Sequence, residues 1–234
     1  MDKKTTKNLL ELSKNSYDKI AADFDVTRKK EIWPEIRNFT EQVLDEDKIL
    51  DAGCGNGRLL ETLKTKEINY LGIDNSAELI ALAQKNYPDY KFLEAELTEL
   101  SFTDLEKFGK EKFNYIFCLA VLQHIPSQSL RVRLLENLRA FLAPNGKIII
   151  SNWNLWASRH RNLILKQAWK KIIGRSEIDF GDIIFPWKNK EGQEISSRYY
   201  HAFTKKELIS ISKQAGFKNI KIKKDKYNYW LTLN

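Results

Sequence analysis

The stretch Asp51-Ala-Gly-Cys-Gly-Asn-Gly57 decides the fold of this chain. The apolar residues leading into it predict a strand at 48–51, and the segment at 58–66 predicts a helix. Glycine lets the backbone turn tightly between the two and lets a ligand approach closely. The N-terminus of the helix presents unpaired N–H groups and the positive end of the helix dipole. We therefore predict that this turn binds a ligand.

The glycine spacing excludes two other nucleotide-binding motifs. A dinucleotide fingerprint would read G-x-G-x-x-G, but Gly57 comes one residue early and Arg58 stands in the expected place. No Gly-Lys-Ser/Thr follows, so the turn is not a P-loop. Seventeen residues after Gly57, the next predicted strand ends in Asp74, whose carboxylate can accept two hydrogen bonds from a ribose diol. Together they predict a nucleoside-bearing cofactor at the carboxyl ends of the strands.

Strands and helices alternate along most of the chain. Further helices are predicted at 5–24, after Pro34, at 76–86, 127–141 and 204–214, and further strands at 70–74, 90–93, 113–120, 147–151, 217–223 and 227–233. This pattern is typical of an α/β fold with a mostly parallel, seven-stranded sheet, helices on both faces and a closing antiparallel hairpin. We expect one domain over 1–234, with a helical lid at 1–45 and an insertion at 153–203.

Composition limits the class of protein further. With 42% hydrophobic and 30% charged residues, the chain is neither disordered nor membrane-embedded. No apolar run approaches the roughly 20 residues of a spanning helix, and the polar N-terminus lacks the features of a secretory signal. Cys54 and Cys118 lack metal-ligand spacing. We expect a cytoplasmic protein with no metal and no membrane partner.

The excess of positive over negative charge lies in the last third of the chain. The net charge is +8 overall, −2 over 1–152 and +10 over 153–234. This asymmetry fits either a polyanionic partner or lysine-rich faces that are merely solvated. A loop is expected at 176–197.

A basic amphipathic helix is predicted at 155–175, a stretch that contains no acidic residue. Leu165, Ala168, Trp169 and Ile172 fall at helical spacing and are expected to pack, which leaves a cationic opposite face. That face can follow RNA phosphates, lie on a membrane surface or be simply solvated, and we favour tRNA. The candidate RNA contacts are Trp153, Arg159, Arg161, Lys166, Lys170 and Lys171.

The glycine turn with Asp51 before it and Asp74 after it resembles motifs I and II of class I S-adenosylmethionine-dependent methyltransferases, which have a Rossmann-like fold. In that family the turn lies against the methionine moiety and the later acid holds the ribose. The resemblance implies the following cofactor-binding residues: Tyr17, Arg28, Asp51, Gly53, Cys54, Gly55, Asn56, Gly57, Asp74, Asn75, Glu96, Leu97 and Leu119. Cys54 is expected to fill space, because methyl transfer from a sulfonium needs no covalent intermediate.

Several other segments resemble the tRNA wobble-uridine carboxymethyl methyltransferases, including the domain fused to AlkB-like hydroxylases. They are Tyr17-Asp-Lys-Ile-Ala21, Trp33-Pro34, Ala120-Val-Leu-Gln-His124, Phe185-Pro-Trp187 and Arg198-Tyr-Tyr-His201. The resemblance runs from about Tyr17 to Trp230. It departs from the family in one extra residue after Arg28, in Gln123 where the family has a second histidine, and in a short segment before Arg198.

This resemblance implies methyl esterification of a carboxylate on the uracil. A carboxylic acid with a pKa near 4 is already ionised at neutral pH, so no general base is needed, and catalysis rests on orientation and water exclusion. The expected substrate-orienting residues are Arg28, His124, Arg198, Tyr199 and His201. His124 is equally suited to satisfying nearby backbone, and Tyr199 and Tyr200 point to opposite faces of an extended segment. Trp153 suits either stacking on the wobble base or core packing.

Two other functions remain open from the sequence. One is methylation of a small-molecule carboxyl, oxygen or nitrogen acceptor with the same cofactor. The other is a non-catalytic RNA-binding protein, against which the intact motifs argue. Eukaryotic members of the resembled family work with a small zinc-binding activator protein, which is a further possible partner.

Overall fold

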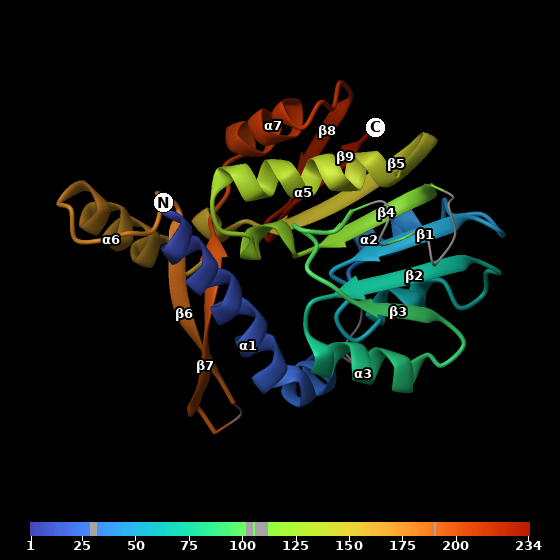
Figure 1. Cartoon of the computed structure of the whole chain (residues 1–234), viewed down its shortest axis with the longest axis horizontal. Helices are drawn as coiled ribbons and strands as arrows, with labels where there is room; N and C mark the ends of the chain where they lie inside the picture. The colour runs from blue at the N-terminus through green and yellow to red at the C-terminus, as the bar shows by residue number, and fades with distance from the viewer. Residues whose placement is uncertain (29–31, 102–104, 106–111, 190) are drawn as a thin grey trace.

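In a computed structural model, the structure describes residues 1–28, 32–101, 105, 112–189 and 191–234, with Arg28 described by its backbone alone. Its centre is a seven-stranded sheet in the order β3-β2-β1-β4-β5-β9-β8 (Figure 1). The strands are β1 Lys48–Ala52, β2 Asn69–Asp74, β3 Lys91–Glu94, β4 Phe113–Leu119, β5 Leu142–Trp153, β8 Ile220–Lys224 and β9 Asn228–Leu233. The first five run parallel, and β9 and β8 close the sheet as an antiparallel hairpin. The predicted α/β fold is confirmed.

The helices are α1 Lys3–Arg28, α2 Pro34–Thr40, α3 Ala77–Asn86, α5 Gln128–Phe141, α6 Arg161–Ile172 and α7 Lys205–Gln214, with short 3-10 helices η1 Arg58–Thr62, η3 Leu122–His124 and η4 Leu155–Ala157. One face of the sheet is covered by α2 and α3, and the other by α5 and α7. Along β1, Ile49 packs into the core under α2 and α3, and Leu50 into the core under α5 and α7. Ser76 and Thr204 cap α3 and α7, each accepting a hydrogen bond from the backbone N–H of the residue three positions later.

Two local predictions are wrong. The helix expected at 58–66 is only η1, because Leu59, Leu60 and Leu63 all turn into the core within one tight 3-10 stretch. The loop expected at 176–197 instead contains β6 Asp182–Lys188 and β7 Glu194–His201, paired as a separate antiparallel ribbon. Pro186 is tolerated in this ribbon because a two-stranded sheet has only edge strands.

The first helix, α1, lies across the carboxyl ends of the parallel strands, against β7 and α3 (Figure 1). Side-chain hydrogen bonds hold it there. Asp18 accepts one from Ser76 at 2.6 Å, and Asp25 accepts one from Asn56 at 2.9 Å. Residues 29–31 of the expected lid lie outside the described residues.

Candidate active site

A cavity opens between α1 and the carboxyl ends of β1, β2 and β4, where the sequence placed the cofactor. Its wall includes most of the residues expected to bind cofactor, namely Tyr17, Asp51, Gly53, Cys54, Gly55, Asn56, Asp74, Asn75, Glu96, Leu97 and Leu119. Gly57 lies behind this wall, against Tyr87 and Phe92. The side chain of Arg28 lies outside the described residues.

The glycine turn needs glycine for conformation and for space. Gly53, Gly55 and Gly57 have φ angles of +82°, +55° and +78°, a region that side chains disfavour. A Cβ at Gly53 would lie 2.1 Å from Cγ2 of Val121, and one at Gly55 would lie 3.4 Å from Cε1 of Phe24. Both glycines line the cavity, so the turn presents backbone there without side chains of its own, which fits the close approach of a cofactor.

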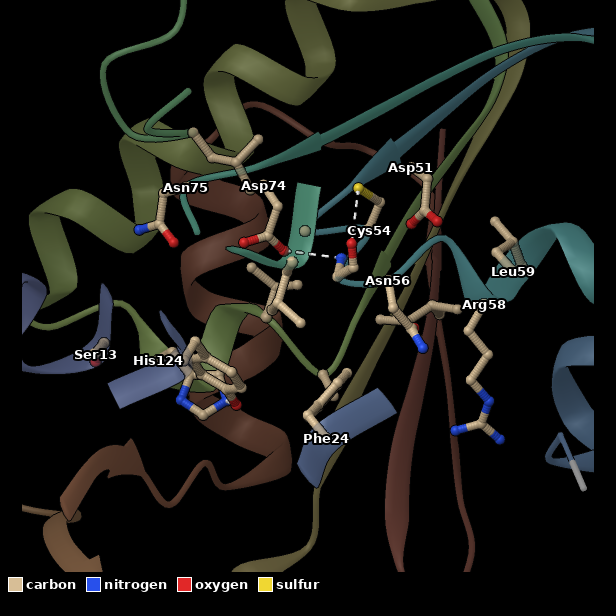
Figure 2. A pocket seen from close by; sticks show the side chains of 18 of the residues that line it. Ser13, Phe24, Asp51, Cys54, Asn56, Arg58, Leu59, Asp74, Asn75 and His124 are labelled. Atoms are coloured by element: carbon tan, nitrogen blue, oxygen red, sulfur yellow. Dashed lines mark hydrogen bonds between the residues drawn. The ribbon is translucent and has the colours of Figure 1, made fainter. Parts of the chain in front are cut away.

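Asp74 joins the turn to the next strand (Figure 2). Its Oδ2 accepts a hydrogen bond from the Gly55 N–H at 2.9 Å, and its Oδ1 accepts one from the Ser76 N–H at 3.0 Å. Burial raises the pKa of its carboxyl group, and the backbone donors oppose that rise. The carboxylate is thus held in one orientation on the wall of the cavity, as a ribose-binding group requires.

Three further polar residues are fixed on the same wall, namely Asn75, Glu96 and Asp51. Asn75 donates to Glu96 at 2.9 Å, and Glu96 also accepts the N–H and hydroxyl of Thr98. Asp51 is 3% exposed, and burial raises its pKa to about 7 although Tyr70 donates to it at 2.8 Å. With a pKa of about 7, Asp51 is about half ionised at neutral pH, so it adds only a partial negative charge to the cavity.

Cys54 behaves as the expected small filler. Its thiol is buried, and Gly72 leaves room for the sulfur, since a Cβ there would come within 2.9 Å of it. Burial, with Asp51 and Asp74 nearby, raises the pKa of the thiol well above its ordinary value. The group therefore stays protonated and is a poor nucleophile.

His124 is part of the cavity wall, and both of its ring nitrogens are engaged. Nδ1 lies 3.0 Å from the carbonyl oxygen of Tyr199, which can only accept, so Nδ1 carries the proton. Nε2 then accepts the hydroxyl of Tyr17 at 2.9 Å. Burial, reinforced by the Arg198 charge, lowers the pKa of His124 to about 3. The neutral ring orients Tyr17 and has no free N–H for a substrate, contrary to the expected donor role.

Tyr199 and His201 lie outside the cavity wall, again contrary to expectation. They share one face of β7, as predicted, and both contact the buried carboxylate of Asp182, at 2.7 and 2.6 Å. Arg131 donates to Asp182 and to Tyr199, and Glu207 lies 2.7 Å from His201. Because this network occupies their polar atoms, the two side chains brace β7 and do not contact a substrate in this arrangement.

The opposite face of β7 carries Arg198 toward an aromatic wall. The guanidinium lies 4.3 Å from the ring of Trp187 and 5.2 Å from that of Tyr200. The Tyr200 ring stacks on Phe185 and on Trp153, with centroids 4.5 and 5.2 Å apart. Trp153 reaches the cofactor cavity, so the aromatic wall leads from that cavity to Arg198.

The Arg198 guanidinium is buried without a counter-charge. The residue is 5% exposed, and its Nε and Nη1 have no hydrogen-bond partner in the described part of the chain. An unpaired buried cation is costly. The site is therefore suited to an anionic group presented beside the cofactor.

Gln123 stands where the resembled family has a second histidine. Its Oε1 accepts the backbone N–H of Trp153 at 2.7 Å. The substitution therefore positions the start of the insertion, including the tryptophan that faces the cavity.

Some cavity residues escaped the sequence analysis. They are Leu10, Ser13, Phe24, Ile32, Trp33, Ile36, Arg58, Leu59, Leu79, Ala120, Val121 and Ile125. Ser13 lies at helical spacing with Leu10 and Tyr17. A small polar residue within an apolar stripe was the one feature of the sequence that could have indicated that this face of the helix lines a cavity.

The predicted RNA contacts of the insertion lie away from this cavity, apart from Trp153. Arg159, Arg161, Lys166 and Lys170 are exposed, and Lys171 donates to the Glu177 carbonyl at 3.3 Å. No helix in the described ranges is long and apolar enough to span a membrane. Within the same ranges, no cluster of three or more histidine, cysteine or acidic residues could hold a metal ion.

Comparison with known proteins agrees with this geometry. The family described as "Methyltransferase domain" matches residues 8–222. A tRNA (carboxymethyluridine(34)-5-O)-methyltransferase of Schizosaccharomyces pombe is 24% identical, covering 92% of each chain. A protein of the same name from Arabidopsis thaliana is 30% identical over 68% of this chain. The match spans only 36% of the length of that protein.

Solved structures show the same fold. A SAM-dependent methyltransferase of Methanosarcina mazei superimposes with a TM-score of 0.65 at 21% identity, covering 87% of this chain and 98% of that one. The family match and the fold show that the cofactor is S-adenosylmethionine, and the glycine turn with Asp74 fits that cofactor. This chain belongs to the class I S-adenosylmethionine-dependent methyltransferases.

Proposed function

We propose that the protein methylates a carboxylate on the side chain of a modified wobble uridine in tRNA, forming a methyl ester. The observation that carries this proposal is the buried guanidinium of Arg198, which lies behind the aromatic wall that starts at Trp153 in the cavity. Its Nε and Nη1 have no hydrogen-bond acceptor within the described residues. Methyl acceptors on nitrogen or on a hydroxyl are neutral and would leave that cation unpaired. The names of the S. pombe and A. thaliana relatives support the same acceptor.

The cofactor, when bound, supplies a sulfonium methyl group, and the acceptor oxygen forms the new O–CH₃ bond as the S–CH₃ bond breaks. The bare floor at Gly53 and Gly55 and the carboxylate of Asp74 would hold that cofactor. No proton is transferred, because the acceptor is already ionised and the products are a neutral ester and a thioether. This accounts for a site whose histidine is neutral and has both nitrogens occupied.

Arg198 would orient the acceptor by a charge-assisted hydrogen bond to one carboxylate oxygen. The other oxygen keeps a free lone pair toward the methyl group. Trp153, half-buried at the junction of cavity and aromatic wall, offers a face on which the uracil can stack. With cofactor and acceptor both bound, the cavity would exclude water. The positive sulfonium and the negative carboxylate would then attract each other strongly, and both charges disappear when the methyl group is transferred.

The tRNA body would extend over the basic insertion, where Arg159, Arg161, Lys166, Lys170 and Lys171 are candidate phosphate contacts. A small activator protein, implied by the family resemblance, remains a prediction. Steep loss of tRNA affinity with added salt would support a polyanionic substrate over a small molecule.

The test is methyl transfer from labelled S-adenosylmethionine to tRNA that contains the carboxylated uridine, followed by mild alkali. Label released as methanol supports the ester. Arg198→Met should lower kcat/KM by about 100-fold, since a buried charged hydrogen bond is worth about 1.5–3 kcal/mol, while cofactor binding by calorimetry stays intact. Arg133→Met, an exposed arginine on α5, is the matched control. Alkali-stable label, or full activity of Arg198→Met, would overturn the proposal.

A further inference from the structure

The outward face of α6 is apolar, although the sequence predicted that these residues pack. Leu165 is 50% exposed, Trp169 62%, Ile172 67% and Ile173 42%. They lie at positions i, i+4, i+7 and i+8, so they form one continuous stripe, here called the α6 stripe. The expectation of a packed face at Leu165, Trp169 and Ile172 is therefore wrong. The helix instead buries Ile164, which packs in a cluster with residues of η4, β6 and β7.

Cations flank the α6 stripe. Arg161 lies on one side of it, and Lys166 and Lys170 lie on the other at helical spacing; all three are exposed. No acidic residue occurs between Leu155 and Ser176. The helix projects from the body of the protein at the end where the N-terminus lies (Figure 1). A broad, flat surface could therefore meet it.

Other occupants fit these observations less well. Four large apolar side chains on one short helix exceed the scattered exposure of an ordinary solvated face. A second copy of the chain would bring like charges together at the borders of the stripe. RNA phosphates would pair with the cations, but Leu165, Ile172 and Ile173 would gain nothing from them. The partner should be both anionic and apolar beneath its charged surface.

We propose that the α6 stripe docks the protein reversibly onto an anionic lipid surface. The helix would lie in the plane of the interface, with Trp169 at headgroup level and the aliphatic side chains at the acyl boundary. The lysines and arginine would meet the lipid phosphates. Because the opposite face of α6 packs on the protein, the docked helix needs no rearrangement. This inference departs from the expectation of no membrane partner and does not depend on the acceptor proposed above. It does mean that lipid and tRNA would compete for Arg161, Lys166 and Lys170.

The test is co-sedimentation of the whole protein with vesicles of phosphatidylcholine alone or mixed with phosphatidylglycerol. Binding should be at least about tenfold stronger to the anionic vesicles and should weaken with salt. The double variant Leu165→Ser/Ile172→Ser should lose about tenfold or more of that binding. Leu44→Ser, at an equally exposed leucine 70% open to solvent, should bind like the wild type. Unchanged cofactor binding by calorimetry would show that both variants are folded.

Three results would overturn the proposal. The first is no preference for anionic vesicles, and the second is undiminished binding by Leu165→Ser/Ile172→Ser. The third is that the same variant keeps its vesicle binding but loses binding to tRNA or to a second copy of the chain. Lower affinity for tRNA would assign the stripe to RNA. A dimer seen by sedimentation equilibrium and dissociated by the substitutions would assign it to a second copy.

Discussion

Replacing Gly53 by alanine tests why the turn needs glycine. Gly53 and Gly192 have nearly equal φ angles, +82° and +80°, but different surroundings. A Cβ at Gly53 would lie 2.1 Å from Cγ2 and 3.1 Å from Cγ1 of Val121, whereas one at Gly192 would meet nothing within 4 Å. The two substitutions therefore share the cost of a left-handed alanine and differ in the steric clash.

Gly53→Ala should be the costlier substitution, because it adds the clash to the cost of the left-handed conformation. The left-handed conformation costs roughly 1–2 kcal/mol for alanine, and overpacking typically adds about 1–3 kcal/mol. At about 2–4 °C per kcal/mol for a chain of this size, Gly192→Ala should lower Tm by about 2–8 °C. Gly53→Ala should lower it by about 4–20 °C and weaken cofactor binding, because Val121 also forms part of the cavity wall.

The assay is thermal unfolding, with a double-mutant cycle to isolate the clash. Val121→Ala removes both methyl carbons and leaves only Cβ, 3.2 Å from the new methyl group. In that background Gly53→Ala should cost about 1–3 kcal/mol less than in the wild type. If Gly53→Ala destabilises no more than Gly192→Ala, or the cycle shows no coupling, the steric reasoning is refuted.

Three further predictions follow from the buried polar groups. Burial raises the pKa of Asp51 in the folded protein to about 7, above its ordinary value. The stability that comes from its bound proton is therefore complete below about pH 4 and is lost as the pH rises to about 7. In urea titrations between pH 5 and 8, the free energy of unfolding of the wild type should fall by roughly 2 kcal/mol more than that of Asp51→Asn. Arg131→Met leaves Asp182 underpaired and should cost about 3–5 kcal/mol, seen as a Tm about 6–20 °C lower, and a shift under 2 °C would contradict this. Asp74→Asn replaces an acceptor of two backbone N–H bonds and should weaken cofactor binding by about 10–100-fold in calorimetry, whereas exposed Glu78→Gln on α3 should not.

The fold was accessible from the sequence because its signals are local. The alternation of apolar strands with helices predicts the parallel sheet, and the turn at Gly53 with Asp74 on the next strand predicts which edge binds the cofactor. The ribbon of β6 and β7 was missed because Pro186 and scattered polar residues weaken the strand pattern. The ribbon also packs against α1 and α6, and such contacts between distant segments cannot be predicted from the periodicity of the sequence.

The direction in which side chains point was less accessible. The sequence put Arg198, Tyr199 and His201 together near a substrate, but the alternation of β7 separates them. Arg198 faces the aromatic wall, whereas Tyr199 and His201 face Asp182. Similarly, helical spacing identified the apolar residues of α6 as one stripe, but spacing alone does not show which side of a helix meets the protein.

By itself, the sequence determined the α/β class and the type of cofactor, and it placed the glycine turn and Asp74 at the sheet edge where the cavity lies. These signals are local, because they come from strand and helix periodicity and from the backbone conformation of one turn. Only the tertiary structure decided that His124 has no free N–H, that Arg198 is buried against aromatic rings with no ion pair among the described residues, and that the α6 stripe faces outward. Each of these depends on which distant segments pack together, because burial and hydrogen-bond partners arise from the whole fold and not from neighbours in the chain.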